Sequence, residues 1–177
     1  MGLRVRPARE SELDEVGDIT VAAYAAAGLL PPDSDYASEL RDAPARFAHS
    51  PLLVAEDPQL DGIAGSVTLC PFGSPLVELA TGVEELEIRM LSVAPRAQRR
   101  GVGEALLSAC IEYAREHGCV RVVLFTQDRP IQTPAMRLYE RLGFHYVPQR
   151  DWQPAPSVLL RAMSVDVARF GVSGPTR

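Results

Sequence analysis

A short glycine-containing segment that follows an apolar run could bind a phosphate group. Residues 86–93 have the pattern of a buried strand, Pro95 interrupts it, and Gly101 and Gly103 precede apolar residues at helical spacing. The first N–H groups of a helix have no partner within it and lie at the positive end of the helix dipole. A ligand can approach glycine backbone closely. The segment therefore predicts an anion site, which we interpret as a pyrophosphate site.

Two common phosphate motifs do not fit this segment. The chain contains no lysine, which a P-loop requires, and Leu106 stands where a dinucleotide-binding fingerprint has its third glycine. The remaining pattern is Gln98, two residues, Gly101, one residue and Gly103. Fixed positive charge beside it is expected from Arg96, Arg99 and Arg100.

This pattern resembles the coenzyme A loop of the Gcn5-related N-acetyltransferase (GNAT) family, which has Gln or Arg, two residues, Gly, one residue, then Gly or Ala. Residues 135–144, AMRLYERLGF, resemble the same family's A-x-x-L-Y-x-x-x-G-F signature. The resemblance is specific over residues 85–152 and looser over the first 80. A strand, a turn and a helix of purely structural role would explain either motif alone, but both motifs in this order favour the family.

The order of predicted elements agrees with this resemblance. Strands are expected at 3–6, 51–56, 62–69, 86–93, 120–126, 144–150 and 158–165, and helices at 11–24, 33–47, 102–117 and 133–143. The predicted fold class is α/β, with a mixed, mostly antiparallel central sheet and helices on both faces. The resemblance adds a splayed cofactor cleft after the fourth strand. Residues 1–168 are expected to form one domain and residues 169–177 a flexible tail.

Composition limits the classes of partner. Hydrophobic residues make up 46% of the 177 residues, but no apolar run approaches the ~20 residues that span a bilayer. A net charge of −5 argues against a nucleic-acid surface, and the three scattered histidines argue against a metal site. We expect no membrane, nucleic-acid or metal partner. Reduced thiols and a cytoplasmic location are expected from the unclustered Cys70, Cys110 and Cys119.

The resemblance implies acetyl-CoA as cosubstrate and assigns its contacts. Backbone groups of Leu91, Ser92 and Val93 would receive the pantetheine arm. The family often has Asn three residues before the Ala of the second motif, and here Gln132 stands there with a longer reach. The pyrophosphate would be bound by Gln98, Arg99, Arg100, Gly101, Val102, Gly103 and Glu104.

The resemblance also implies a general acid and a general base. Tyr139 would give a proton to the departing thiolate, although the same ring could simply pack on its helix. Glu87 would take a proton from the amine, although it could instead form a salt bridge with an arginine such as Arg89 or with a cross-strand neighbour. Glu84 and Glu85 are alternative bases. Strand alternation is expected to place on one side Glu87, Arg89, Leu91 and Val93.

The sequence leaves the class of protein and the acceptor open. An N-acetyltransferase acting on a small-molecule or peptide amine is one reading, and a catalytically silent acyl-CoA-binding module is another. A third is an acidic interaction domain with no ligand. The acceptor side is expected at residues 29–36, including Asp33 and Asp35, and at residues 151–157. The chain could be a monomer or a homodimer.

Overall fold

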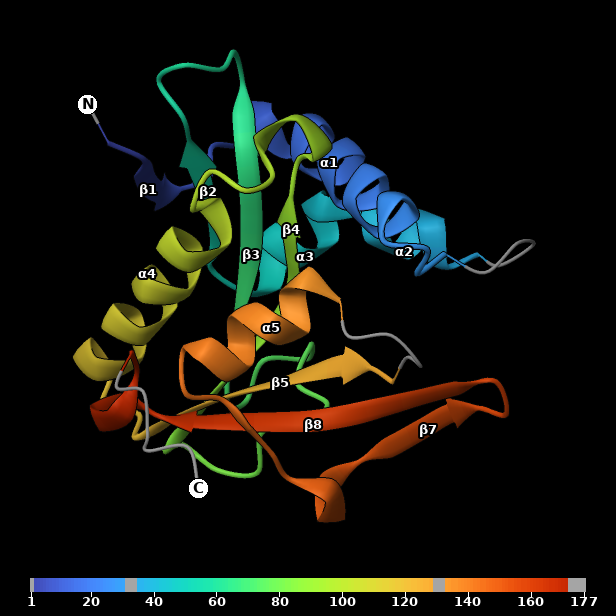
Figure 1. The fold of residues 1–177 in the computed structure, drawn as a ribbon, viewed down its shortest axis with the longest axis vertical. Coiled ribbons are helices and arrows are strands. Elements are labelled where there is room, and N and C mark those ends of the chain that lie inside the picture. The colour runs from blue at the N-terminus through green and yellow to red at the C-terminus, as the bar shows by residue number, and fades with distance from the viewer. Residues whose placement is uncertain (1, 31–34, 129–132, 172–177) are drawn as a thin grey trace.

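An eight-stranded mixed sheet forms the centre of the computed structural model, which describes residues 2–30, 35–128 and 133–171 (Figure 1). The strands run in the order β1-β2-β3-β4-β5-β8-β6, and β7 also pairs with β8. Only β4 and β5 are parallel, which confirms the predicted mixed, mostly antiparallel sheet. The strands are β1 (Arg4–Pro7), β2 (Leu52–Glu56), β3 (Ile63–Pro71), β4 (Glu85–Val93), β5 (Arg121–Gln127), β6 (His145–Tyr146), β7 (Trp152–Ala155) and β8 (Val158–Asp166).

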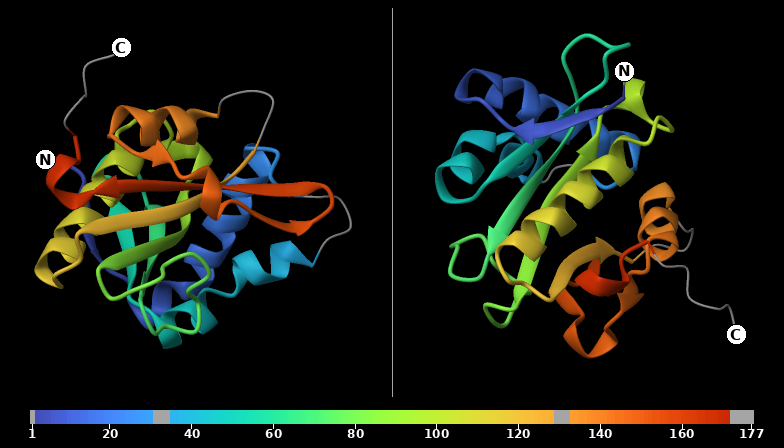
Figure 2. Two further views of the ribbon diagram at one scale, coloured as in Figure 1. Left: turned by 90° about the horizontal axis from the view of Figure 1, so that it is seen from below. Right: turned by 90° about the vertical axis from the view of Figure 1, so that its left-hand side faces the viewer.

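Helices cover both faces of this sheet. Figure 2 shows α1, α2 and α3 on one face of β2–β4, with α4 and α5 on the other. Leu106, Leu107 and Cys110 of α4 are fully buried, as is Val16 of α1, so each main helix turns an apolar stripe toward the strands. The helices are α1 (Leu13–Ala26), α2 (Tyr36–Arg41), α3 (Ala43–His49), α4 (Val102–Glu116) and α5 (Pro134–Arg141).

The two halves of the sheet separate beside β4. Parallel pairing between β4 and β5 covers only residues 85–87 and 121–123. Beyond Glu87 the strands diverge, and in Figure 1 β2, β3 and β4 lie nearly vertical while β5 and β8 cross the lower part of the molecule. The predicted splay after the fourth strand is therefore present.

A β-bulge interrupts β4 at Met90. Arg89 and Ser92 lie opposite Thr68 and Ser66 of β3, so β4 carries one residue more than its partner over this interval. Met90 has a φ of 56°, in the left-handed region that non-glycine residues seldom adopt. The extra residue reverses the order in which side chains alternate between the two faces.

The bulge overturns the expected alternation. The Arg89 guanidinium lies 3.6 Å from Glu39 of α2, on one face of the sheet. A Cβ built on Gly103 of α4 would lie 3.7 Å from Val93 Cγ2, on the other face. The prediction that one side of β4 carries all four alternating side chains is therefore wrong, because Arg89 and Val93 face opposite ways.

Two predicted elements are divided differently in the structure. The helix expected through residue 47 is broken between α2 and α3, where the Asp42 carboxylate accepts a hydrogen bond from the N–H of Ala45 and caps α3. Pro44, in the first turn of α3, cannot donate the N–H that a continuous helix needs. The strand expected at 144–150 is reduced to β6, because Pro148 begins a 3-10 turn. Part of the predicted loop at 151–157 instead forms β7.

The end of the described chain packs on the core. Phe170 contacts the main hydrophobic cluster, and the Gly171 N–H donates to the carbonyl of Leu142. Residues 172–177 of the predicted tail lie outside the described residues.

A buried carboxylate joins three segments at the start of β4. Glu85 is 2% exposed and accepts hydrogen bonds from both Nη atoms of Arg150 (2.9 Å each), from Nε of Arg121 (3.2 Å) and from the N–H of Thr81 (2.9 Å). Arg150 also donates to the carbonyl of Leu79. Burial alone would raise the pKa of Glu85, but these donors outweigh it and lower that pKa to about 2.

Because the pKa of Glu85 is lowered, we expect the free energy of unfolding to decrease in acid. Glu12, hydrogen-bonded to Arg6, also has its pKa lowered to about 2. The pKa values of both carboxyl groups lie below the ordinary 4.5. Between about pH 2 and pH 4.5 the unfolded chain therefore binds more protons than the folded chain. The stabilisation is complete above about pH 5 and is lost as the pH falls toward 2. Urea unfolding midpoints should fall steadily over this range, and a constant midpoint would contradict the assignment.

Candidate functional site

The connection from β4 to α4 has the geometry of an anion site. A 3-10 turn at Pro95–Ala97 follows β4, and Gly101 then precedes α4 with a φ of 80°. Glycine adopts this left-handed conformation without the penalty that a side chain imposes. Arg99 is also left-handed, with a φ of 62°, so the loop holds a strained non-glycine residue beside the helix N-terminus. The first N–H groups of α4 are available to an anion.

The three arginines near this loop differ in their partners among the described residues. Arg100 donates through Nε to Asp57 (2.6 Å) and through Nη2 to Gln59 (2.6 Å). Arg96 donates to the carbonyls of Asp61 (3.1 Å) and Ile63 (2.9 Å). Arg96 and Arg100 therefore hold the β2–β3 connection, and Arg96 also lies 3.7 Å from Glu15. The expectation that all three arginines serve the site stays a prediction. Arg99 is exposed and has no ion pair with a described residue.

Gly103 packs against α5. A Cβ built on it would lie 2.9 Å from Leu138 Cδ2, closer than real side chains approach. The first turn of α4 therefore lies directly against α5. The glycine was expected to admit a ligand, and the structure adds a contact between helices as a reason for it.

The part of β4 beside the gap offers backbone groups. Leu91 and Val93 lie beyond the last β4–β5 pair and carry partly buried side chains. The Ser92 side chain points away from the gap. Its Oγ lies 3.0 Å from Ser66 Oγ of β3 and 3.4 Å from Thr20 Oγ1 of α1. A ligand in the gap would therefore meet Ser92 through its backbone alone.

Tyr139 is a buried residue in the second turn of α5. Its helix begins after Thr133, whose Oγ1 accepts from the N–H of Met136, and Pro134 occupies the first turn. The Tyr139 ring is 7% exposed and packs 5.6 Å from the Phe144 ring. No hydrogen bond joins its hydroxyl to another described residue. Burial raises the pKa of Tyr139, so the phenol keeps its proton at neutral pH.

Glu87 is held by the backbone of the β3–β4 connection. Its Oε2 accepts the N–H groups of Glu78 (2.9 Å), Leu79 (2.7 Å) and Ala80 (3.0 Å), and the residue is 1% exposed. The alternative salt bridge with Arg89 is not formed, since Arg89 pairs with Glu78 and Glu39. Glu87 therefore anchors a loop, and only Oε1 is outside these hydrogen bonds.

The two alternative bases are poorly suited to the role. Glu85 is ionised and bound by two arginines, as described above, and its lowered pKa makes it a weak proton acceptor. The Glu84 side chain is 46% exposed and lies 3.5 Å from Arg121. Both residues precede Glu87, whereas β4 separates from β5 only after Glu87, so both lie outside the separated part of β4.

Glu78 is a titratable residue near the site that sequence reasoning missed. Its side chain is 35% exposed, and Oε1 lies 3.0 Å from Nη1 of Arg89. Burial raises its pKa, with Arg89 acting in the opposite direction. Residues 71–82 have no periodic pattern, so the proximity of Glu78 to Arg89 is seen only in the structure.

The predicted acceptor side is described in part. The rings of Tyr24 and Tyr36 meet edge to face at 6.1 Å, and both hydroxyls approach the Met90 sulfur, at 3.8 and 4.0 Å. Trp152 is exposed and lies 6.1 Å from Phe125. Asp33 and Gln132 lie outside the described residues.

The described residues contain neither a cluster of metal-ligating side chains nor a membrane-spanning helix. Within residues 2–30, 35–128 and 133–171, no group of three or more His, Cys, Asp or Glu side chains could hold a metal ion. Over the same residues, no helix is long and apolar enough to cross a bilayer.

Comparison with known proteins decides the family. The sequence model of the acetyltransferase (GNAT) family matches residues 14–144, which span both the anion loop and the helix that carries Tyr139. The chain belongs to the GNAT family. A solved GNAT-fold relative, a putative acetyltransferase from Salmonella typhimurium with its cofactor acetyl-CoA, has a TM-score of 0.66 and 21% identity, covering 99% of this chain and 100% of its own. At that identity the likeness supports the fold alone.

The curated relatives that this chain matches are longer proteins. N-acetyltransferase family 8 member 2 from Rattus norvegicus is 28% identical over 73% of this GNAT chain and 52% of its own length. Mycothiol acetyltransferase from Arthrobacter sp. (strain FB24) is 45% identical over 33% of this chain and 17% of its own. The chain thus spans about half or less of the curated relatives it matches.

Proposed function

We propose that this chain is an acetyl-CoA-dependent N-acetyltransferase that acts on a primary amine by direct attack in a ternary complex. The observation that carries the proposal is the separation of β4 from β5 beside the free N-terminus of α4. Unpaired strand backbone and helix N–H groups suit an elongated ligand with amides and a pyrophosphate. Acetyl-CoA would supply an activated acetyl thioester.

The proposed binding roles fall on the two sides of the gap. Backbone groups of Leu91 and Val93 would pair with the pantetheine amides. The N–H groups from Arg99 to Glu104 would bind the pyrophosphate, with Gln98 beside them. The Glu104 carboxylate does not oppose this, because Arg141 lies 3.0 Å from it and offsets its charge.

The proposed chemistry needs one proton donor and one acceptor. The amine nitrogen bonds to the acetyl carbon as the carbon–sulfur bond breaks, and Tyr139 gives its proton to the sulfur. Glu87 takes the proton that the amine loses, at Oε1, directly or through water, since Oε2 is occupied. A backbone N–H of β4 would stabilise negative charge on the carbonyl oxygen.

Product formation tests the proposal. Acetyl-CoA is incubated with polyamines, amino acids, aminoglycosides and short peptides, and acetylated products are detected by mass spectrometry. Acetylation of one acceptor class establishes the enzyme and identifies the acceptor. Binding of acetyl-CoA without any product would overturn the catalytic proposal and favour a silent acyl-CoA-binding module.

Replacing Glu87 with Gln is expected to lower kcat/KM about tenfold at pH 7, because only water then accepts the proton. The deficit should shrink as the pH rises toward the pKa of the amine, since the free amine needs no base. The measurement is the pH–rate profile, with thermal melting to check that the β3–β4 connection is intact. Glu78→Gln is the matched variant, and a profile that moves only in that variant assigns the base to Glu78.

A further inference from the structure

The anion loop carries too little positive charge for the ligand proposed above. A pyrophosphate and a phosphomonoester together carry roughly 3.5 to 4 negative charges at neutral pH. The α4 N-terminus supplies about half a positive charge and Arg99 supplies one. Arg96 and Arg100 are bound elsewhere, and Arg141 is offset by Glu104. A further cation beside the loop would stabilise the bound ligand.

Arg137 of α5 is in the right place to supply it. Its neighbour Leu138 has its Cδ2 2.9 Å from the position of a Cβ built on Gly103, so the second turn of α5 packs against the first turn of α4. Arg141, one turn further along α5, reaches Glu104 in the first turn of α4. Residues four apart lie on one face of a helix, so Arg137 shares the face that Arg141 turns toward α4.

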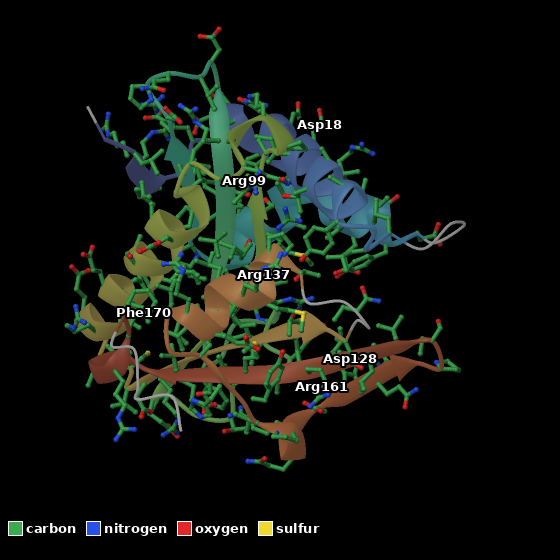
Figure 3. All side chains as sticks on the ribbon, in the orientation of Figure 1. Asp18, Arg99, Asp128, Arg137, Arg161 and Phe170 are labelled. Carbon is green, nitrogen blue, oxygen red and sulfur yellow. The ribbon has the colours of Figure 1, made fainter. Side chains whose placement is uncertain are left out.

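Arg137 also has its charge available. It is exposed and has no ion pair with a described residue, in contrast to Arg141 on the same face. In Figure 3, Arg99 lies above Arg137, on the β4–α4 connection and α5 respectively.

We propose that Arg137 binds a phosphate group of coenzyme A and forms, with Arg99, a two-sided clamp across the N-terminus of α4. This inference rests on the proposed function. It makes α5, which carries Tyr139, part of the cofactor-binding surface: Arg137 contacts the phosphates while Tyr139, two residues later, faces inward. A guanidinium suits the role because its donors form paired hydrogen bonds with phosphate oxygens.

Calorimetric titration with coenzyme A tests the clamp without a turnover assay. Arg137→Gln should weaken binding about tenfold, the lower end of what charge-assisted hydrogen bonds contribute, because the site is exposed to solvent. Raising the salt concentration should weaken wild-type binding more than binding by the variant. Arg115→Gln is the matched control, because it removes the same charge from the last turn of α4 and should leave affinity unchanged.

Dephospho-coenzyme A identifies the phosphate. If the Arg137→Gln effect vanishes with this ligand, Arg137 binds the 3′-phosphate, and if it persists, Arg137 binds the pyrophosphate. Equal affinity of wild type and Arg137→Gln for coenzyme A would overturn the clamp alone. A wild-type protein that does not bind coenzyme A would overturn the proposed function instead.

Discussion

Replacing Tyr139 with Phe will lower kcat at least about a hundredfold and leave the dissociation constant of acetyl-CoA unchanged. The substitution removes only the hydroxyl, which makes no hydrogen bond within the described residues. The ring keeps its contact with Phe144, so the fold should be unaffected. Without this donor, the thiolate must leave unprotonated or take a proton from water.

The matched control is Tyr113→Phe, on α4, where the ring stacks on His117 at 3.9 Å. It removes an identical hydroxyl from a tyrosine whose ring faces a different partner, and kcat should stay at the wild-type value. Steady-state rates give kcat, and calorimetry gives acetyl-CoA affinity. An undiminished kcat in Tyr139→Phe would show that this tyrosine only packs.

Replacing Glu85 with Gln will reduce the free energy of unfolding by about 3 kcal/mol. The change leaves Arg150 and Arg121 without their shared carboxylate while keeping the volume of the side chain. The estimate is at the low end for a buried pair, because the two arginine side chains are 22% and 37% exposed and regain some hydration.

A reduction of this size corresponds to a fall in Tm of roughly 6–12 °C for a chain of this length. Glu84→Gln is the control, because that exposed carboxylate contributes at most about 1 kcal/mol. Chemical denaturation of both variants at pH 7 measures the difference. Equal stabilities would mean that the Glu85 network is not a stabilising contact.

Local patterns in the sequence predicted those parts of the fold that depend on local rules. The order of strands and helices, the Gly101 turn and the Pro134 helix start follow from periodicity, left-handed backbone and proline geometry. The break between α2 and α3 was not predicted, although Pro44 fits the first turn of a new helix.

Other features depend on contacts between distant residues and carry no local signal. Arg100 lies next to the anion loop in sequence, yet Asp57, 43 residues away, binds its side chain. The bulge at Met90 has no glycine or proline to indicate it. The donors to Glu87 come from an aperiodic segment, so neither its anchoring role nor the position of Glu78 could be predicted.

The short β4–β5 ladder has a consequence for association with other proteins. A strand with unpaired backbone ordinarily templates pairing with another polypeptide and so favours aggregation. Here the unpaired length of β4 lies inside the sheet, between β3 and the diverging β5, with α5 in front of it (Figure 1). An incoming protein strand would need room for side chains on both faces, and α1 and α4 already occupy those faces. The same edge is therefore open to a thin, flexible chain of amides and closed to most polypeptides.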